Sequence, residues 1–319
     1  MKIRAAAFQI TDSCNLNCRY CYMDADNKHR EFIPLEKLHE AVEYLASREI
    51  YFIQWTGGEP LLYPDLIKAL TFAKEKGISS SLFTNGLLIN ENNIKQLKEL
   101  VSNFAISLDG GEANNNLDRG GFNKVMDTLK IFKNNDIHYS ISSTLSKRNL
   151  NSMEEIACIA RDYGAHIVRF NAVSFFGRAS LYADEMLSDS DMEYIKNEAK
   201  ELTIKNNYEI VIETNLLNSR EIKAYGRGLS NTLTKAVWIN KKLEISFFPF
   251  AATLKDKNYS NLYSLDSLHI EEIEEKINHI LEYMMKENRT IYNIYEEIQL
   301  RYYSDEQRRV YFEEISGKK

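Results

Sequence analysis

The sequence predicts an α/β fold in which six parallel strands alternate with helices and form a partial (β/α)6 TIM-like barrel. Three observations predict this fold. Apolar runs of strand length recur along roughly the first 175 residues, segments with helical spacing separate them, and six such units fit. Strand–helix alternation implies a parallel sheet with right-handed crossovers. Because a closed barrel of this type has eight units, six units predict an open one, with reactive groups at the C-terminal ends of its strands.

Each expected helix presents its apolar residues on one face. In the segment 63–77, for example, Leu66, Ala69, Leu70 and Ala73 share a face that can pack on a sheet. The expected helices lie at 35–49, 63–77, 90–102, 120–132 and 153–163. The expected strands lie at 4–10, 51–56, 80–84, 104–108, 139–145 and 166–173.

The regular alternation fades after about residue 180. We therefore expect the barrel domain over residues 1–185 and a smaller, mixed α+β C-terminal extension over 186–319. The elements expected in the extension are a helix at 188–206, a strand at 208–214, a hairpin region at about 215–265 with its hairpin in 236–250, and a helical tail from Leu265 onward.

Composition narrows the class of protein. A chain of 319 residues with 44% hydrophobic and 27% charged residues is typical of a soluble globular protein. It contains no apolar run long enough to span a bilayer and no signal peptide at its N-terminus, so we expect a cytoplasmic protein with no membrane partner. A net charge of −6 without a basic stripe argues against nucleic acid as a partner.

Three of the four cysteines crowd into "TDSCNLNCRYCYMDA", as Cys14, Cys18 and Cys21. A disulfide would leave one of these thiols unpaired and does not suit a reducing compartment. A structural zinc site needs a fourth ligand, and because no second CxxC or HxxxH follows, zinc is the weaker alternative. A catalytic redox pair would be a lone CxxC near a thioredoxin-like pattern, and that pattern is absent from this sequence. What remains is a 4Fe–4S cluster with three protein ligands, whose fourth iron is open for chemistry.

The cysteine stretch and several later motifs resemble one known family. "CNLNCRYCY" matches the CxxxCxxC motif of the radical S-adenosylmethionine (SAM) superfamily, including an aromatic residue, Tyr20, before the third cysteine. Over residues 4–180 the chain resembles the branch related to peptide maturases and anaerobic sulfatase-maturating enzymes. The other matching motifs are TGGEP at 56–60, TNG at 84–86, SLDG at 107–110, DRGGF at 118–122 and FGRA at 176–179.

This resemblance implies a chemistry for the cysteines. Cys14, Cys18 and Cys21 would hold three irons of a single 4Fe–4S cluster, and the amine and carboxylate of SAM would chelate the fourth. An electron from the cluster would then cleave SAM and produce a 5′-deoxyadenosyl radical that abstracts a hydrogen atom. The resemblance also implies a flavodoxin or ferredoxin as the electron donor.

The resemblance also suggests which residues contact SAM. Gly57 and Gly58 would let the backbone approach the SAM amine, with the Glu59 carboxylate beside it; the alternative for this segment is a plain strand-to-helix turn. Tyr20 would pack near the adenine. The remaining candidates are Asn85 and Ser107, as donors to the ribose or methionyl groups, and Arg119, as the partner of the SAM carboxylate.

Several of these residues have alternative interpretations. Arg119 lies in a shortened "LDR" where the family usually has "HDxxR", and it could equally be a solvated residue at a helix start. Asp109 could be a turn residue in "DGG", and Cys158 falls off the apolar stripe of its helix as a bystander thiol. Four polar residues within apolar strands either line a ligand cavity or are satisfied core groups: Gln9, Gln54, Ser143 and Asn171.

The C-terminal region departs from the resemblance. Relatives in this branch often carry a cysteine-rich SPASM or twitch-like extension that binds further clusters, and residues 225–268 resemble its skeleton without any cysteine. Because Phe or Ala cannot replace a thiolate ligand, we expect a degenerate, cluster-free extension that caps the barrel and shapes the substrate groove. Without further clusters, redox-neutral outcomes such as epimerisation become more plausible.

The leading hypothesis is therefore a radical SAM oxidoreductase that modifies a ribosomally synthesised peptide. The same chemistry on a small molecule, such as a sugar or an amino acid, is the alternative, and a non-catalytic iron–sulfur electron-transfer or sensor protein is a distant one. The chain starts at the first barrel strand, so we expect leader recognition by the C-terminal part or by a separate leader-binding protein.

Overall fold

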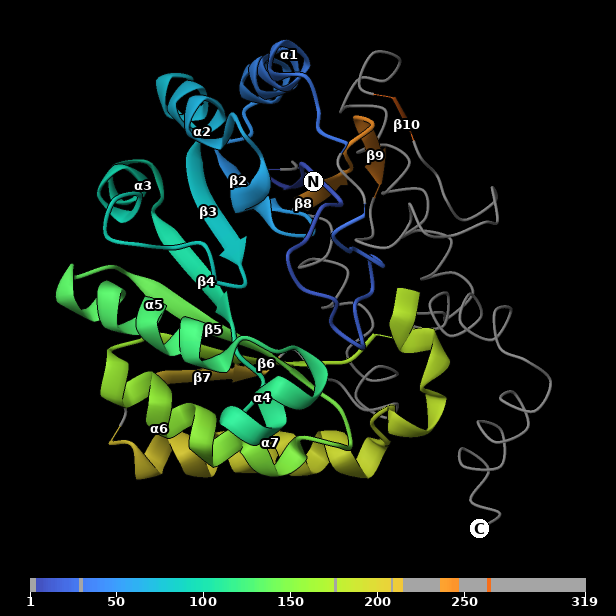
Figure 1. Cartoon of the computed structure of the whole chain (residues 1–319), viewed down its shortest axis with the longest axis vertical. Coiled ribbons are helices and arrows are strands. Elements are labelled where there is room, and N and C mark those ends of the chain that lie inside the picture. Colours follow the sequence, from blue (N-terminus) through green and yellow to red (C-terminus); the bar gives the residue numbers. More distant parts are fainter. Residues whose placement is uncertain are drawn as a thin grey trace, which may run out of the picture.

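A computed structural model describes residues 4–28, 31–174, 177–207, 209–214, 236–246 and 263–264. Its centre is a single curved sheet with the strand order β10-β9-β8-β1-β2-β3-β4-β5-β6-β7. Helices lie along the outer side of this sheet (Figure 1). The strands are β1 (Ala5–Gln9), β2 (Phe52–Thr56), β3 (Ser79–Thr84), β4 (Asn103–Ser107), β5 (Tyr139–Leu145), β6 (Ile167–Ala172), β7 (Val211–Thr214), β8 (Ala236–Ile239), β9 (Glu244–Ser246) and β10 (Tyr263–Ser264).

The six strands expected from the sequence are all present, and each pairs in parallel with the next one along the chain. The expected helices separate them, which confirms the α/β fold and the partial barrel. The helices are α1 (Leu35–Ser47), α2 (Leu66–Glu75), α3 (Ile94–Leu100), α4 (Glu112–Asp118), α5 (Phe122–Asn134), α6 (Met153–Tyr163) and α7 (Asp189–Lys205), with short 3-10 turns η1 (Pro60–Leu62), η2 (Leu150–Ser152), η3 (Gly177–Leu181) and η4 (Ala183–Glu185).

The barrel core lies between the sheet and the apolar faces of these helices. The Phe8 and Trp55 rings, which sit opposite each other on β1 and β2, stack with centroids 5.8 Å apart. Both side chains are fully buried, and the Trp55 indole nitrogen donates to the Ser80 hydroxyl at 2.9 Å. Burying an aromatic side chain of this size stabilises the fold by about 2 kcal/mol or more.

The sheet continues beyond residue 185. Ser188 caps α7 with a capping box to Asp191, and the helix leads into β7, which pairs in parallel with β6. On the opposite edge, β8 pairs in parallel with β1 and begins the expected hairpin with β9. Strands β7 and β8 therefore extend the predicted six parallel strands at their two edges, while the division at residues 185 and 186 stays a prediction.

One helix was not predicted. The segment "EANNNLD" forms α4, although it has no apolar stripe, because its buried residues are polar: Asn115 is 0% exposed and Asp118 is 8% exposed. The predicted tail from Leu265 and most of the region 215–265 lie outside the described residues. Among the described helices, none is both long enough and apolar enough to cross a lipid bilayer.

Candidate active site

The predicted site residues gather at the C-terminal ends of neighbouring parallel strands. The cysteine loop (residues 14–21) follows β1, the Gly57–Glu59 segment follows β2, and Asn85 directly follows β3. Ser107 is the last residue of β4 and is half-buried. Because parallel strands end at the same edge of a sheet, residues that are far apart in sequence meet there.

The three cysteines of the loop are unpaired thiols. Cys14 and Cys18 are buried and Cys21 is half-buried. Burial raises the pKa of Cys14 to about 12 and also raises the pKa of Cys18. Such thiols stay protonated at neutral pH unless a positively charged metal stabilises the thiolate.

The arrangement of these thiols fits an iron–sulfur cluster. Cys14 lies near both Cys18 and Cys21, and Cys18 lies near Cys21. In the part of the chain that the structure describes, however, no three Cys, His, Asp or Glu side chains converge on one metal-ion position. A cubane binds each cysteine to a different iron, so its ligand sulfurs stand farther apart than the ligands of one zinc ion.

The two glycines after β2 contact the chain itself. A Cβ on Gly57 would lie 2.4 Å from the Thr11 carbonyl oxygen, and one on Gly58 would lie 2.3 Å from the Ser13 carbonyl oxygen. The backbone also hydrogen-bonds across this contact, from Gly58 N to Thr11 O and from Glu59 N to Ser13 O, both at 2.8 Å. The glycines thus hold the segment against the residues that lead into Cys14.

Glu59 is fully buried and links the ends of β2 and β3. Its Oε1 accepts hydrogen bonds from the Thr84 hydroxyl at 2.7 Å and from Leu61 N at 3.1 Å, and its Oε2 accepts from Asn85 N at 2.8 Å. Burial raises the pKa of Glu59 to about 7, against the opposing effect of these three donors. Its contact with the SAM amine stays a prediction.

Asn85 lies against the cysteine loop. Its Nδ2 donates to the Asn15 side-chain oxygen at 2.7 Å and lies 3.9 Å from the Cys14 sulfur, while its Oδ1 accepts from Leu87 N at 3.0 Å. The TNG motif therefore places a polar amide beside a predicted cluster ligand.

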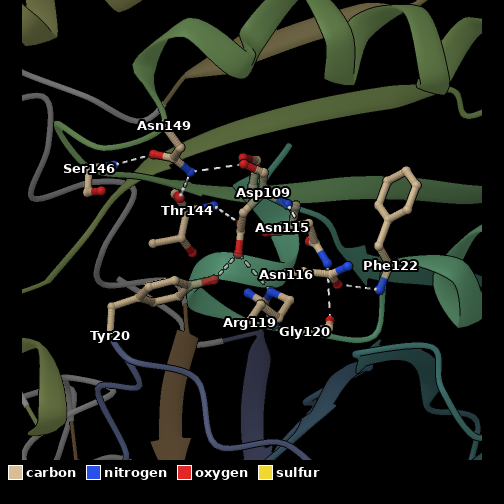
Figure 2. A network of polar contacts seen from close by, with 12 residues as sticks. Tyr20, Asp109, Asn115, Asn116, Arg119, Gly120, Phe122, Thr144, Ser146 and Asn149 are labelled. Atoms are coloured by element: carbon tan, nitrogen blue, oxygen red, sulfur yellow. Dashed lines mark hydrogen bonds and ion pairs between the residues drawn. The ribbon is translucent and has the colours of Figure 1, made fainter. Parts of the chain in front are cut away.

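Asp109 is the centre of a buried polar network (Figure 2). Its Oδ2 accepts hydrogen bonds from the Tyr20 hydroxyl and from Arg119 Nε, the latter at 2.7 Å. Its Oδ1 accepts from Thr144 N at 2.7 Å. The side chain of Asp109 is 1% exposed and that of Arg119 is 11% exposed. Asp109 is thus not a simple turn residue, and the alternative of a solvated Arg119 is wrong because Arg119 ends α4 in a buried ion pair.

The FGRA motif supplies a contact that we did not predict as part of the site. Arg178 donates to the backbone oxygens of Cys18 and Ala25 and to the Asp24 carboxylate, at 2.8 to 2.9 Å. Its backbone nitrogen donates to the Cys21 oxygen at 3.0 Å. The signal was available in the sequence, because the motif follows the sixth strand, where residues of the active edge are expected.

The four other polar residues in the strands differ in burial and in their hydrogen-bond partners. Gln9 donates to the Asp12 carboxylate at 2.6 Å, and Asn171 donates to Ser142 Oγ at 3.2 Å. The hydroxyl of Ser143 is buried without a hydrogen-bond partner in the described chain, so it is not a satisfied core group. The last of the four, Gln54, is half-buried in β2. Cys158 lies on α6, beside Arg161 and Lys205 and outside the cysteine loop.

Comparison with known proteins points to the same family as the sequence motifs. The family model of the Radical SAM superfamily matches residues 8–157. An uncharacterised protein of Methanocaldococcus jannaschii is 34% identical over 51% of this chain and 60% of its own length. The subtilosin biosynthesis protein AlbA of Bacillus subtilis is 23% identical over 54% of this chain and 40% of its own length. The Fe-coproporphyrin III synthase of Methanosarcina barkeri is 30% identical over 57% of this chain and 47% of its own length.

The chain therefore spans 40 to 60% of the length of these curated relatives. Among solved structures, Streptococcus suis SuiB bound to its precursor peptide SuiA is similar with a TM-score of 0.68. That similarity covers 80% of this chain and 62% of SuiB at 14% sequence identity, which supports the fold.

Proposed function

Residues 8–157 of the chain are a radical SAM domain, and from this premise we propose that the protein modifies a ribosomally synthesised peptide by abstracting a hydrogen atom from one of its residues. The observation that carries the chemistry is the single loop with three unpaired thiols, enclosed by Asn85 and by the Asp109–Arg119 pair at the active edge of the sheet. The relative AlbA, named for bacteriocin biosynthesis, supports a peptide as the substrate class.

The residues present fit the cofactors that this proposal requires. A 4Fe–4S cluster with bound SAM supplies the electron and the hydrogen-abstracting radical. Cys14, Cys18 and Cys21 would each bind one iron through a thiolate. Arg119, whose side chain is 11% exposed, brings a positive charge close to the ligand set. Against the opposing effect of burial, Asp109 is the main cause of the raised pKa of its guanidinium, and Cys18 and Cys21 add to it. Its terminal amino groups suit the SAM carboxylate.

The sequence and the fold suggest different roles for the barrel domain and for the extension that follows it. The barrel domain would hold the cofactors, and the cysteine-free extension after residue 185 would contribute to the groove for the peptide. Electrons would come from a flavodoxin or a ferredoxin, and a separate protein could present the leader.

The first test measures cofactors and SAM cleavage. Anaerobically reconstituted protein should contain about four irons per chain, and dithionite should drive formation of 5′-deoxyadenosine from SAM. Cys18→Ala should abolish SAM cleavage, while Cys158→Ala, which changes a thiol outside the loop, should retain it. About eight irons per chain would refute a single cluster, and loaded wild-type protein that leaves SAM intact would refute the enzyme.

The second test addresses the substrate. Co-expression with short peptides encoded near the gene, followed by mass spectrometry, should show a peptide with a changed mass or a changed stereocentre. The relative named Fe-coproporphyrin III synthase favours the small-molecule alternative, here a tetrapyrrole. Formation of Fe-coproporphyrin III from a tetrapyrrole precursor, with every candidate peptide unmodified, would favour that alternative over ours.

A further inference from the structure

We propose that Asp109 is a positioning residue that holds Arg119 and Tyr20 as one unit beside the cysteine loop and compensates the charge of Arg119 near the cluster. This inference rests on the proposed function for its SAM-binding part. It gives the aspartate of the SLDG motif a role beyond that of a turn residue.

Asp109 is itself held rigidly by three parts of the chain. Its backbone nitrogen donates to the Asn115 side chain of α4 at 3.1 Å, and its backbone oxygen accepts from Asn149 Nδ2 at 3.0 Å. Thr144 N, in β5, donates to its Oδ1 at 2.7 Å. Because both main-chain groups and one carboxylate oxygen are bound, the direction of the other oxygen is fixed (Figure 2).

That second oxygen, Oδ2, accepts hydrogen bonds from Tyr20, which belongs to the cysteine loop, and from Arg119, which lies beside it. Tyr20 lies between Cys18 and Cys21 and donates its hydroxyl to this oxygen. Arg119 donates its Nε to the same oxygen, with its guanidinium carbon 5.6 Å from the centre of the Tyr20 ring. Within the described part of the chain, the two terminal amino groups of Arg119 donate to no other residue, so a planar pair of donors stays available for an anionic ligand.

The pair also sets the charge near the cluster ligands. The Asp109 carboxylate lies 2.7 Å from Arg119 Nε, and both groups contact Tyr20, which stands between Cys18 and Cys21 in the cysteine loop. An isolated guanidinium at this position would stabilise the thiolates and a reduced cluster, and the Asp109 carboxylate opposes that effect. Asp109→Asn should therefore change the reduction potential of the cluster, an effect that a residue with a purely structural role would not produce.

The experiment compares four variants of the iron-loaded protein: Asp109→Asn, Arg119→Gln, the double variant, and Asp118→Asn. Asp118 is the matched control, because it is also a buried aspartate that pairs with an arginine, Arg148 at 3.3 Å, yet it makes no side-chain contact with Tyr20 or Arg119. Two quantities are measured: the midpoint potential of the cluster without SAM, and the dissociation constant of SAM with the oxidised cluster.

We expect Asp109→Asn to raise the midpoint potential and Arg119→Gln to lower it, with the double variant between them. Each single variant should weaken SAM binding by about tenfold, and the double variant should be no weaker than Arg119→Gln alone, because both act through one guanidinium. Asp118→Asn should leave both quantities near those of the wild type.

The proposal is overturned if Asp109→Asn matches Asp118→Asn in both measurements, or if the losses of SAM affinity add in the double variant. Should Asp109→Asn take up no iron, Tyr20→Phe serves as the second variant, since it removes only the hydroxyl that binds Asp109. It should weaken SAM binding in the wild type but not in Arg119→Gln; additive losses there also overturn the proposal. Absence of SAM binding to the wild type would instead count against the proposed function, and the potentials would still test Asp109.

Discussion

Gly58→Ala is expected to destabilise the protein and to impair cluster loading. The added Cβ would lie 2.3 Å from the Ser13 carbonyl oxygen, 2.7 Å from the Ser13 carbonyl carbon and 2.8 Å from the Asp12 oxygen. All three are backbone atoms that no side-chain rotation can move away. Reaching even the 3.0 Å limit for real Cβ contacts requires the two segments to separate by 0.7 Å, the difference between 3.0 and 2.3 Å.

That separation determines the expected magnitude. The two hydrogen bonds across the contact, from Gly58 N to Thr11 O and from Glu59 N to Ser13 O, are 2.8 Å long, so an added 0.7 Å would stretch them to 3.5 Å. Losing two buried backbone hydrogen bonds, together with residual strain, should cost about 3 kcal/mol of unfolding free energy. Ser13 directly precedes Cys14, so the displacement should also move the first of the predicted cluster ligands.

The assay is urea unfolding of the iron-free protein at 25 °C, with iron per chain measured after anaerobic reconstitution. Gly77→Ala is the control, because its Cβ would meet nothing within 4 Å and only its φ of +77° opposes a side chain. That variant should lose about 1 kcal/mol and load iron normally. If Gly58→Ala lost no more stability than Gly77→Ala and loaded iron fully, the packing argument would be refuted.

Three further predictions follow from other contacts. Arg178→Gln removes one hydrogen bond to Cys18 in the cysteine loop and two to Asp24 and Ala25 just after it, and should speed iron loss to a chelator about tenfold. Arg161→Gln, on the exposed side of α6, should not change that rate, and equal rates for the two variants would contradict the prediction. Burial raises the pKa of Glu59 from 4.5 to about 7, so between these two values the folded state binds more protons than the unfolded state. The unfolding free energy of the iron-free protein should therefore fall by roughly 3 kcal/mol as the pH rises through that range. Glu59→Gln should abolish this pH dependence. Ser188→Ala should lower the unfolding free energy by about 1 kcal/mol through loss of the α7 capping box, with unchanged iron content; a stability equal to wild type would show that the cap contributes nothing.

Most of the barrel could be predicted because its elements carry local patterns. Helix α2, for example, buries Leu66, Ala69, Leu70 and Ala73, the four residues that share a face in the sequence. Helix α4 lacked such a stripe and was missed, because its buried Asn115 is satisfied by hydrogen bonds to Asp109 N and Gly120 O rather than by apolar packing. Strand β7 was expected as a strand, but its place beside β6 depends on hydrogen bonds that no local pattern records.

The sequence alone indicated where a cluster would bind, because the predicted ligands are neighbours in the chain: Cys14, Cys18 and Cys21 are brought together by a single loop whatever surrounds them. Only the tertiary structure decided what holds that loop. Arg178 reaches Cys18 across 160 positions of sequence, and Tyr20 reaches Asp109 across 89. Such contacts arise when parallel strands bring their C-terminal ends to one edge, and the resulting hydrogen bonds and ion pairs depend on distances in space that the order of residues does not contain.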